Sequence, residues 1–197
     1  MHNNLTENDF GKKQIENLKN NSPFENKKAF AKRIIIMNGK GGVGKDALCE
    51  GAARKYRTWN ISSIDPIKSI ARQHGWNGEK DPKSRRFLAE LKQTFVNYND
   101  LPNVFLKEKT EAFMASETAE LLFVHIREPE QIEYYRKNIY PAVAKAVLIK
   151  RKAIDDIENY GNKADDNVNN YEYDLVFNND LPLEESIEDF ISKIEKL

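Results

Sequence analysis

The sequence is poor in cysteine, in net charge and in long apolar runs. Its 197 residues contain a single cysteine, Cys49, which excludes an internal disulfide framework and favours a reducing compartment. Basic and acidic residues each total 31, so no overall field would attract nucleic acid or an anionic membrane. No apolar run reaches membrane-spanning length, and residues 1–33 are too polar for a signal peptide. We therefore expect a cytoplasmic protein with no nucleic-acid partner and no membrane partner.

The few histidines and the lone cysteine form no cluster with metal-ligand spacing, and the chain has no internal repeat. His125 alternates with apolar neighbours, which favours a core histidine, and Cys49 is expected to be a small buried hydrophobe. With 40% hydrophobic residues, the length suits one domain with a substantial core. We expect a polar N-terminal extension over residues 1–33 and one domain over residues 34–197.

A glycine-rich stretch after the apolar run Ile34–Met37 is the most specific feature of the sequence. Gly39, Gly44 and Lys45 fit the spacing G-x-x-x-x-G-K of a phosphate loop. Such glycines let successive backbone N–H groups and the positive end of the next helix point at one anion. The lysine would contact the β- and γ-phosphates of a nucleotide, whereas the plainer alternative is a turn between strand and helix. The predicted nucleotide-binding residues are Gly39, Lys40, Gly41, Gly42, Val43, Gly44, Lys45, Asp46 and Ala47.

The residue after the loop lysine departs from the usual pattern. A serine or threonine hydroxyl normally binds Mg²⁺ there, but this chain has Asp46. A carboxylate can hold Mg²⁺ directly or through a bound water. We therefore predict Asp46 as the metal ligand, in a weaker or differently arranged site.

Five short apolar segments alternate with helical patterns. Because the first segment, Ile34–Met37, is continuously apolar, it is typical of a parallel sheet that is covered on both faces. A phosphate loop after the first segment then implies a parallel three-layer α/β fold with a five-stranded sheet. The predicted strands cover residues 34–37, 60–64, 121–126, 146–149 and 174–177, with a helix over about 46–58 after the first.

Two helix starts follow one another between the second and third predicted strands. Asp65-Pro66 and Asp81-Pro82 each combine a capping aspartate with a proline in the first turn. We expect a helical insertion, or flap, over about residues 66–100, and a further helix over about 104–116. The charged, asparagine-rich residues of about 151–172 predict a lid, for which a disordered surface loop is the alternative.

Arginines stand at three separated places in the chain. Arg85 and Arg86 lie early in a predicted helix, where the macrodipole disfavours cations, so they are either solvated, paired with a nearby glutamate, or bound to an anion. Arg127 follows the third strand and Arg151 follows the fourth. If these side chains converge above Lys45, they suit a kinase whose acceptor is itself an anion.

Taken in order, these motifs resemble the nucleoside monophosphate kinases, and most closely the phage-type deoxynucleoside monophosphate kinases. The first matching stretch includes the aspartate after the loop lysine, which that family also carries. The matching stretches are Gly44-Lys45-Asp46, Asp65-Pro66-Ile67-Lys68, Arg85-Arg86, Arg127, Arg151 and Tyr173 to Asp180.

The resemblance implies a P-loop NTPase fold with a helical insert that binds the nucleoside monophosphate (NMP) and a short lid. It implies ATP as phosphoryl donor, Mg²⁺ as cofactor, a (deoxy)nucleoside 5′-monophosphate as acceptor, and a monomer or homodimer. Lys45, Arg127 and Arg151 would be catalytic, and Asn178 would lie near the adenine. The residues implied for the acceptor are Asp65, Lys68, Arg85, Arg86 and Arg127.

One position departs from the family and leaves alternatives open. The third strand of many such kinases ends in a metal-organising aspartate, whereas this chain has Val124-His125-Ile126-Arg127 there, so Asp46, Asp65 or Glu128 would have to substitute. The loop from Lys40 also looks like that of ParA/MinD partitioning ATPases, which dimerise on ATP. A kinase of a non-nucleotide phosphate such as phosphomevalonate, and a catalytically silent nucleotide-binding protein, are further alternatives.

Overall fold

The computed structural model describes residues 32–79, 81–139, 144–155 and 168–197, to which all structural statements below refer. The chain divides into two units, Met1–Ala31 and Lys32–Leu197, and the described residues belong to the second. Most of the predicted N-terminal extension and most of the predicted lid lie outside the described residues, and Arg33, predicted in the extension, is the first residue of the first strand. In the described helices, no segment combines the length and the apolar character needed to cross a membrane.

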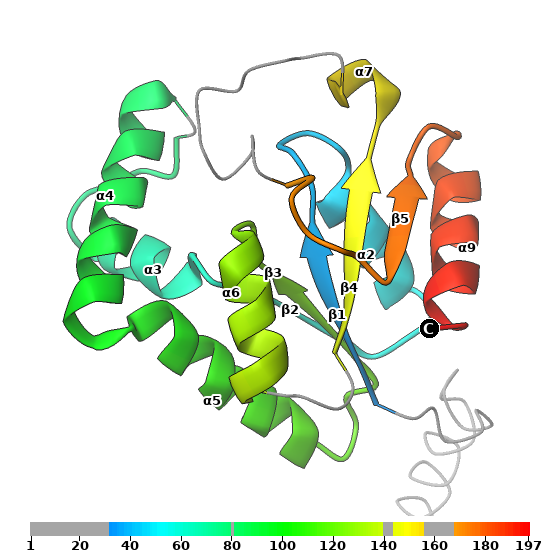
Figure 1. Ribbon diagram of the computed structural model, residues 1–197, viewed down its shortest axis with the longest axis horizontal. Helices are drawn as coiled ribbons and strands as arrows, with labels where there is room; N and C mark the ends of the chain where they lie inside the picture. Colours follow the sequence, from blue (N-terminus) through cyan, green and yellow to red (C-terminus); the bar gives the residue numbers. More distant parts are fainter. Residues whose placement is uncertain (1–31, 80, 140–143, 156–167) are drawn as a thin grey trace, which may run out of the picture. The chain divides into compact units, whose positions relative to one another are not determined.

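Five parallel strands form the sheet at the centre of this unit (Figure 1). Its order, β2-β3-β1-β4-β5, places the phosphate-loop strand in the middle, flanked by β3 and β4. This is the predicted parallel three-layer α/β fold of the P-loop NTPase type. The strands are β1 (Arg33–Asn38), β2 (Thr58–Ser62), β3 (Leu121–His125), β4 (Ala144–Lys150) and β5 (Leu175–Asn178).

Helices connect the strands and cover both faces of the sheet (Figure 1). On one face, the Phe190 ring of the last helix packs against Phe123 of β3 and Phe177 of β5, with ring centroids 6.2 and 5.3 Å apart. On the other face, alternate residues of β1 and β3 join a cluster with Phe113 and Tyr135. The helices are α2 (Lys45–Ala53), α3 (Asp65–Gln73), α4 (Pro82–Asn99), α5 (Leu101–Ala115), α6 (Pro129–Tyr134), the π-helical turn η1 (Tyr135–Ile139), α7 (Lys152–Asp155) and α9 (Leu183–Ile194).

The strand registers bring the carboxyl ends of the strands to one edge. Ser62 of β2 pairs with His125 of β3, which in turn pairs with Met37 of β1, next to the loop. Lys150 of β4 pairs with Asn178 of β5 at the same edge. Ligands of open parallel sheets collect at this edge, so it is where a site is sought.

Several predicted boundaries are wrong. Strand β2 covers residues 58–62 instead of 60–64, because the Asp65 carboxylate accepts a hydrogen bond from the Ser62 N–H (2.7 Å) and turns the chain there. Helix α2 ends at Ala53, where the chain turns back and buries Tyr56 against the core. Helix α5 begins at residue 101 instead of 104, directly after Asp100, whose φ of 53° breaks the chain away from α4.

The two predicted Asp-Pro helix starts differ in the structure. Asp81 is the N-cap of α4, and its carboxylate accepts hydrogen bonds from the Ser84 N–H (3.0 Å) and the Ser84 hydroxyl (2.7 Å). Asp65 is not a cap, because the N-cap of α3 is Ile64 and Asp65 already lies inside the helix. The same dipeptide therefore starts two helices by different means, and it leaves the Asp65 carboxylate at the strand edge.

Candidate functional site

The phosphate loop is shaped by glycines that no other residue could replace without strain. Gly39 has a φ of 135°, and a Cβ there would meet the Ile149 carbonyl oxygen of β4 at 2.4 Å. Gly44, with a φ of 92°, is the left-handed N-cap of α2, and a Cβ there would meet the Asn179 Nδ2 at 2.4 Å. The turn therefore passes close to both neighbouring segments, with the N-terminus of α2 directly after it.

The Lys45 ammonium lies over this loop. Its Nζ donates hydrogen bonds to the carbonyl oxygens of Gly39 (2.5 Å) and Lys40 (2.8 Å). The side chain thus returns from the first turn of α2 to the start of the loop and encloses the turn. A phosphate oxygen is a stronger acceptor than a carbonyl, since it is charged, so the ammonium is positioned to bind one.

Two buried asparagines, which the sequence did not single out, hold the loop in place. The Asn38 Oδ1 accepts from the Gly39 N–H (2.7 Å), and its Nδ2 donates to the Arg127 carbonyl (3.0 Å) and the Tyr173 hydroxyl (2.7 Å). The Asn179 Nδ2 donates to the Val43 carbonyl at 2.7 Å. The available signal was a polar residue directly after each apolar strand at the edge where ligands collect.

Asn178, predicted near the adenine, has a different surrounding from Asn179. It is exposed at the end of β5, where its backbone pairs with Lys150. Its neighbour Asn179 is buried and touches the loop. The adenine role of Asn178 stays a prediction, while the role of the adjacent asparagine in positioning the loop is visible in the structure.

His125 stands at the end of β3, next to the phosphate loop. Its Nε2 lies 3.9 Å from the Cys49 Sγ of α2, so the ring faces the helix that follows the loop. Burial lowers the pKa of His125 to about 4. The negative charge of Asp46 acts to raise this pKa, and the positive charge of Lys45 acts to lower it. The imidazole is therefore neutral near pH 7. The Cys49 thiol is buried, which raises its pKa, in agreement with the predicted small hydrophobe.

The buried imidazole predicts an acid-sensitive free energy of unfolding. The unfolded imidazole titrates near 6.5 and the folded one near 4, so between these values the unfolded state binds more protons. We expect the His125 contribution to be fully favourable above pH 6.5 and to fall as pH drops, by about 3 kcal/mol at pH 4. Urea unfolding of the wild type and of His125→Gln at pH 7 and pH 4.5 measures it. A pH dependence equal in both proteins would contradict this assignment.

Asp65 and Lys68 lie one helical turn apart at the start of α3, beside the carboxyl end of β2. Burial raises the pKa of Asp65, while the Ser62 N–H and the charges of Lys68 and Arg72 lower it in part. The carboxylate is therefore half-buried at the strand edge, as the predicted substrate role requires. No contact in the structure tests that role.

The four predicted arginines are all exposed. Arg85 and Arg86 are in the first turns of α4, and neither forms an ion pair with any described residue, so the alternative of a structural salt bridge has no support. Arg127 follows β3, where its carbonyl is fixed by Asn38, and Arg151 directly precedes α7. The described contacts do not bring these side chains together, and their convergence on one anion stays a prediction.

The residues at the loop fit a nucleotide with its Mg²⁺ ion, with one protein ligand for the metal. Asp46 is exposed in the first turn of α2, next to Lys45. Within residues 32–79, 81–139, 144–155 and 168–197, no three His, Cys, Asp or Glu side chains group as a metal site. Mg²⁺ commonly takes one or two carboxylates and completes its shell with phosphate oxygens and water, so Asp46 would suffice beside ATP.

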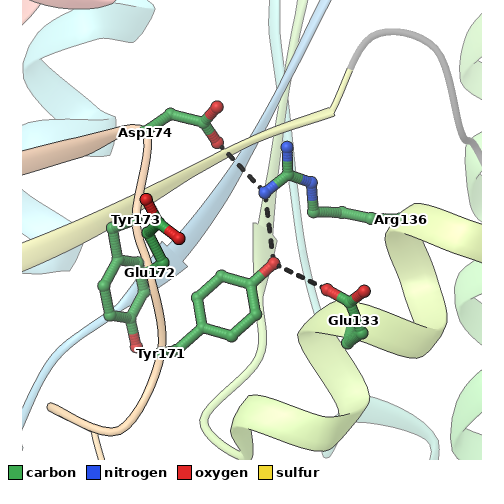
Figure 2. A pocket seen from close by; sticks show the side chains of 6 residues that line it. All are labelled: Glu133, Arg136, Tyr171, Glu172, Tyr173 and Asp174. Carbon is green, nitrogen blue, oxygen red and sulfur yellow. Dashed lines mark hydrogen bonds and ion pairs between the residues drawn. The ribbon is translucent and has the colours of Figure 1, made fainter.

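A polar pocket of about 380 Å³ lies apart from the loop (Figure 2). Arg136 of η1 contacts the Asp174 carboxylate (3.3 Å) and the Tyr171 hydroxyl (3.1 Å), and that hydroxyl donates to Glu133 of α6 (3.1 Å). These side chains bind one another across the pocket (Figure 2). These contacts therefore hold the segment before β5 against α6 and η1. The Tyr173 hydroxyl of the same segment also accepts a hydrogen bond from Asn38.

Comparison with known proteins gives matches among solved structures alone. No family model matches the chain, and no curated protein matches it either. The chain is similar to a sugar kinase from Janibacter sp. HTCC2649, with 15% identity and a TM-score of 0.48 over 83% of this chain and 95% of that one. It is similar to a Thermus thermophilus protein, with 14% identity and a TM-score of 0.47 over 85% and 98%.

A further match is the shikimate kinase from Aquifex aeolicus, with 11% identity and a TM-score of 0.45 over 83% of this chain and 96% of that one. Each of these TM-scores is below 0.5. The fold assignment therefore rests on the strand order and on the loop geometry of this chain.

Proposed function

We propose that this protein transfers the γ-phosphoryl group of ATP to the phosphate of a (deoxy)nucleoside 5′-monophosphate, giving the diphosphate. The observation that carries the proposal is the loop between β1 and α2, with the Lys45 ammonium bonded to the carbonyls of Gly39 and Lys40. Backbone N–H groups, a helix N-terminus and an ammonium are the groups that hold a triphosphate. Helices α3, α4 and α5 are inserted between β2 and β3, and the acceptor would bind to this insert.

The proposal gives each predicted residue a role in phosphoryl transfer. Lys45 binds the β- and γ-phosphates, and Asp46 holds Mg²⁺ together with phosphate oxygens. Arg127 binds the acceptor phosphate at the carboxyl end of β3, and Arg151 neutralises the charge between donor and acceptor. Catalysis then consists of positioning and electrostatic stabilisation, since phosphoryl transfer requires little covalent participation by the protein. Arg85 and Arg86 complete the acceptor site from α4.

A coupled ADP-release assay tests the proposal. The full-length protein is mixed with ATP and Mg²⁺, and each common ribo- and deoxyribonucleoside monophosphate is added in turn. We expect at least one of them to stimulate ADP release well above the rate with ATP alone. If none does and phosphomevalonate does, the protein is a kinase of a non-nucleotide phosphate. No stimulation by any acceptor, together with ATP-dependent dimerisation, would instead support the ParA/MinD-like alternative.

A hydroxyl acceptor is the second candidate, and the Asp65 carboxylate is the observation that favours it. Transfer to a hydroxyl benefits from a general base, and burial raises the pKa of this carboxyl at the strand edge. Nucleosides and simple sugars therefore belong in the same assay. If they serve as acceptors, Asp65→Asn should abolish their use, whereas transfer to a phosphate acceptor, which needs no general base, should be weakened through binding but not abolished.

Arg127→Ala separates the acceptor from the donor. We expect the KM for the nucleoside monophosphate to rise roughly 10- to 100-fold, since a charged hydrogen bond to phosphate is lost, while the KM for ATP stays within about twofold. Steady-state kinetics with each substrate varied in turn measure both constants. Arg57→Ala is the matched control, because Arg57 lies before β2 and pairs with Glu120, away from the loop. An equal rise in both KM values would show that Arg127 does not bind the acceptor specifically.

A further inference from the structure

Glu128 follows Arg127 at the end of β3, and the ion-pair partner of its side chain lies in another segment of the chain. It is the N-cap residue of α6, but its carboxylate makes no capping hydrogen bond with that helix. It turns instead toward the insert, where its Oε1 accepts a hydrogen bond from the Lys92 Nζ of α4 at 2.6 Å. Both side chains are largely buried, with 16% of Lys92 and 26% of Glu128 exposed. This ion pair links the insert to the end of β3.

The second oxygen of this carboxylate is the unusual one. Glu128 Oε2 is buried and has no hydrogen-bond partner among the described residues, a property it shares only with the Trp76 Nε1. Buried polar atoms are almost always paired, because leaving one without a partner costs the full desolvation penalty. An acceptor of this kind calls for a donor that the described residues do not supply, such as a polar group of a bound ligand.

The charge state of Glu128 keeps this oxygen an acceptor. Burial raises the pKa of Glu128. The charge and hydrogen bond of Lys92, the Glu128 backbone N–H and the charge of Arg127 together lower it by more, so the net shift is downward. The carboxyl group is thus ionised at neutral pH and cannot satisfy itself by donating a proton. Only an N–H or O–H group, or a cation, can bind Oε2 in this state.

The location of Glu128 indicates that the hydrogen-bond donor belongs to the substrate that accepts the phosphoryl group. The residue lies at the carboxyl end of β3, next to Arg127, and contacts the insert that is proposed to hold the acceptor. Arg127 presents a guanidinium suited to the phosphate, whereas Glu128 would repel that phosphate. The two neighbouring residues therefore suit the two ends of one molecule: an anionic group and, apart from it, a hydrogen-bond donor.

We propose that Glu128 selects the acceptor by accepting a hydrogen bond at Oε2 from an amino group of its base or a hydroxyl group of its sugar. The inference rests on the proposed function and adds a specificity residue to it. Lys92 holds the carboxylate in place through Oε1. Acceptors that present a carbonyl oxygen or no polar group at this point leave Oε2 unpaired and bind more weakly, because a site built to bond a donor rejects an analogue that lacks it.

Pairs of acceptors that differ in one group test this selection in the wild type. Cytidine and uridine monophosphates differ in an amino group against a carbonyl, as do adenosine and inosine monophosphates. Each ribonucleotide also differs from its deoxyribonucleotide in one hydroxyl. We expect the wild type to prefer one donor-bearing series by roughly tenfold or more in kcat/KM. The series that shows the preference identifies whether the base or the sugar supplies the donor.

The variants Glu128→Gln and Lys92→Met distinguish two roles of Glu128: selecting the acceptor, and attaching the insert to the end of β3. Both variants break the ion pair, but only Glu128→Gln removes the charged acceptor. We expect Glu128→Gln to bring the preference to about twofold or less, or to invert it, with the KM for ATP unchanged. Lys92→Met should lower kcat/KM for all acceptors alike and keep the preference. If Glu128→Gln does not fold, Glu128→Asp, which withdraws the carboxylate by one methylene, should show the same loss of preference.

Three results would overturn the inference. A wild type that phosphorylates nucleoside monophosphates without preference for donor-bearing ones removes its basis. A preference that survives in Glu128→Gln, or a uniform loss equal to that of Lys92→Met, shows that Glu128 only attaches the insert. In each of these cases the proposed function still stands, because the wild type is active. A wild type that uses no nucleoside monophosphate overturns both the inference and the proposed function.

Discussion

Lys45→Met is expected to lower kcat for ADP formation roughly 10²- to 10³-fold, with the fold intact. The ammonium bonds to the Gly39 and Lys40 carbonyls at the mouth of the loop, where the β- and γ-phosphates would lie. Removing one preorganised charge that stabilises the transferring group typically costs this much. Methionine keeps the length of the side chain, so the change isolates the charge. The coupled ADP-release assay, run with the preferred acceptor, measures the effect.

Two lysines serve as comparisons for this variant. Lys107→Met removes an exposed lysine whose ion pair among the described residues is with Glu111 of its own helix, and we expect full activity. Lys40→Met tests the partitioning-ATPase alternative, in which the early loop lysine acts across a dimer. If the Lys45→Met protein retains the wild-type kcat, the loop lysine does not take part in catalysis. Loss of ATP-dependent dimerisation in Lys40→Met, without loss of acceptor-stimulated turnover, would separate assembly from catalysis.

Gly39→Ala is expected to destabilise the protein by about 2–4 kcal/mol and to abolish ATP binding. The φ of 135° is disfavoured for any residue with a side chain, and the added Cβ would meet the Ile149 carbonyl oxygen at 2.4 Å. That oxygen belongs to the backbone of β4, which is paired with β1 and β5, so it cannot move aside cheaply. Urea unfolding and ATP titration by calorimetry measure the two effects.

Gly41→Ala is the matched control within the same loop. Gly41 has no positive φ, and a Cβ there meets no atom within 4 Å. We expect its free energy of unfolding to stay within about 0.5 kcal/mol of the wild type, as for an ordinary exposed substitution. Equal destabilisation by the two alanines would show that the close approach of Gly39 to β4 does not shape the loop.

Sequence periodicity predicted the sheet well because its signals are local. Short segments between turn and helix signals, most of them apolar, identified all five strands, and the glycine-lysine spacing placed the loop between β1 and α2. Boundaries were less predictable where a side-chain hydrogen bond decided them, as at Asp65, whose carboxylate ends β2 instead of capping α3. Helix α4 shows the same limit: Phe87, Leu91, Phe95 and Tyr98 recur at helical spacing, yet no residue of that helix is fully buried, and Tyr98 is 81% exposed.

The candidate site divides in a similar way. Lys45 and Asp46 could be singled out because their chemistry is attached to a motif with fixed spacing. Asn38, Asn179 and the pair of Lys92 with Glu128 could not, because each acts on a residue far away in the chain. Arg127 was found from its place after a strand, but its convergence with Arg151 depends on side-chain positions that the described contacts do not settle into one site.

The sequence by itself determined the parallel α/β fold, the phosphate loop and the exclusion of disulfide chemistry, because backbone propensity, glycine spacing and composition act over a few residues at a time. Only the tertiary structure decided which polar groups meet. Closing the sheet placed His125 against Cys49, fixed the loop with asparagines from β1 and from the end of β5, and left one oxygen of Glu128 buried without a partner. Contacts of this kind depend on strand order and register, which bring together residues as far apart in the chain as Asn179 and Val43, 136 residues from one another.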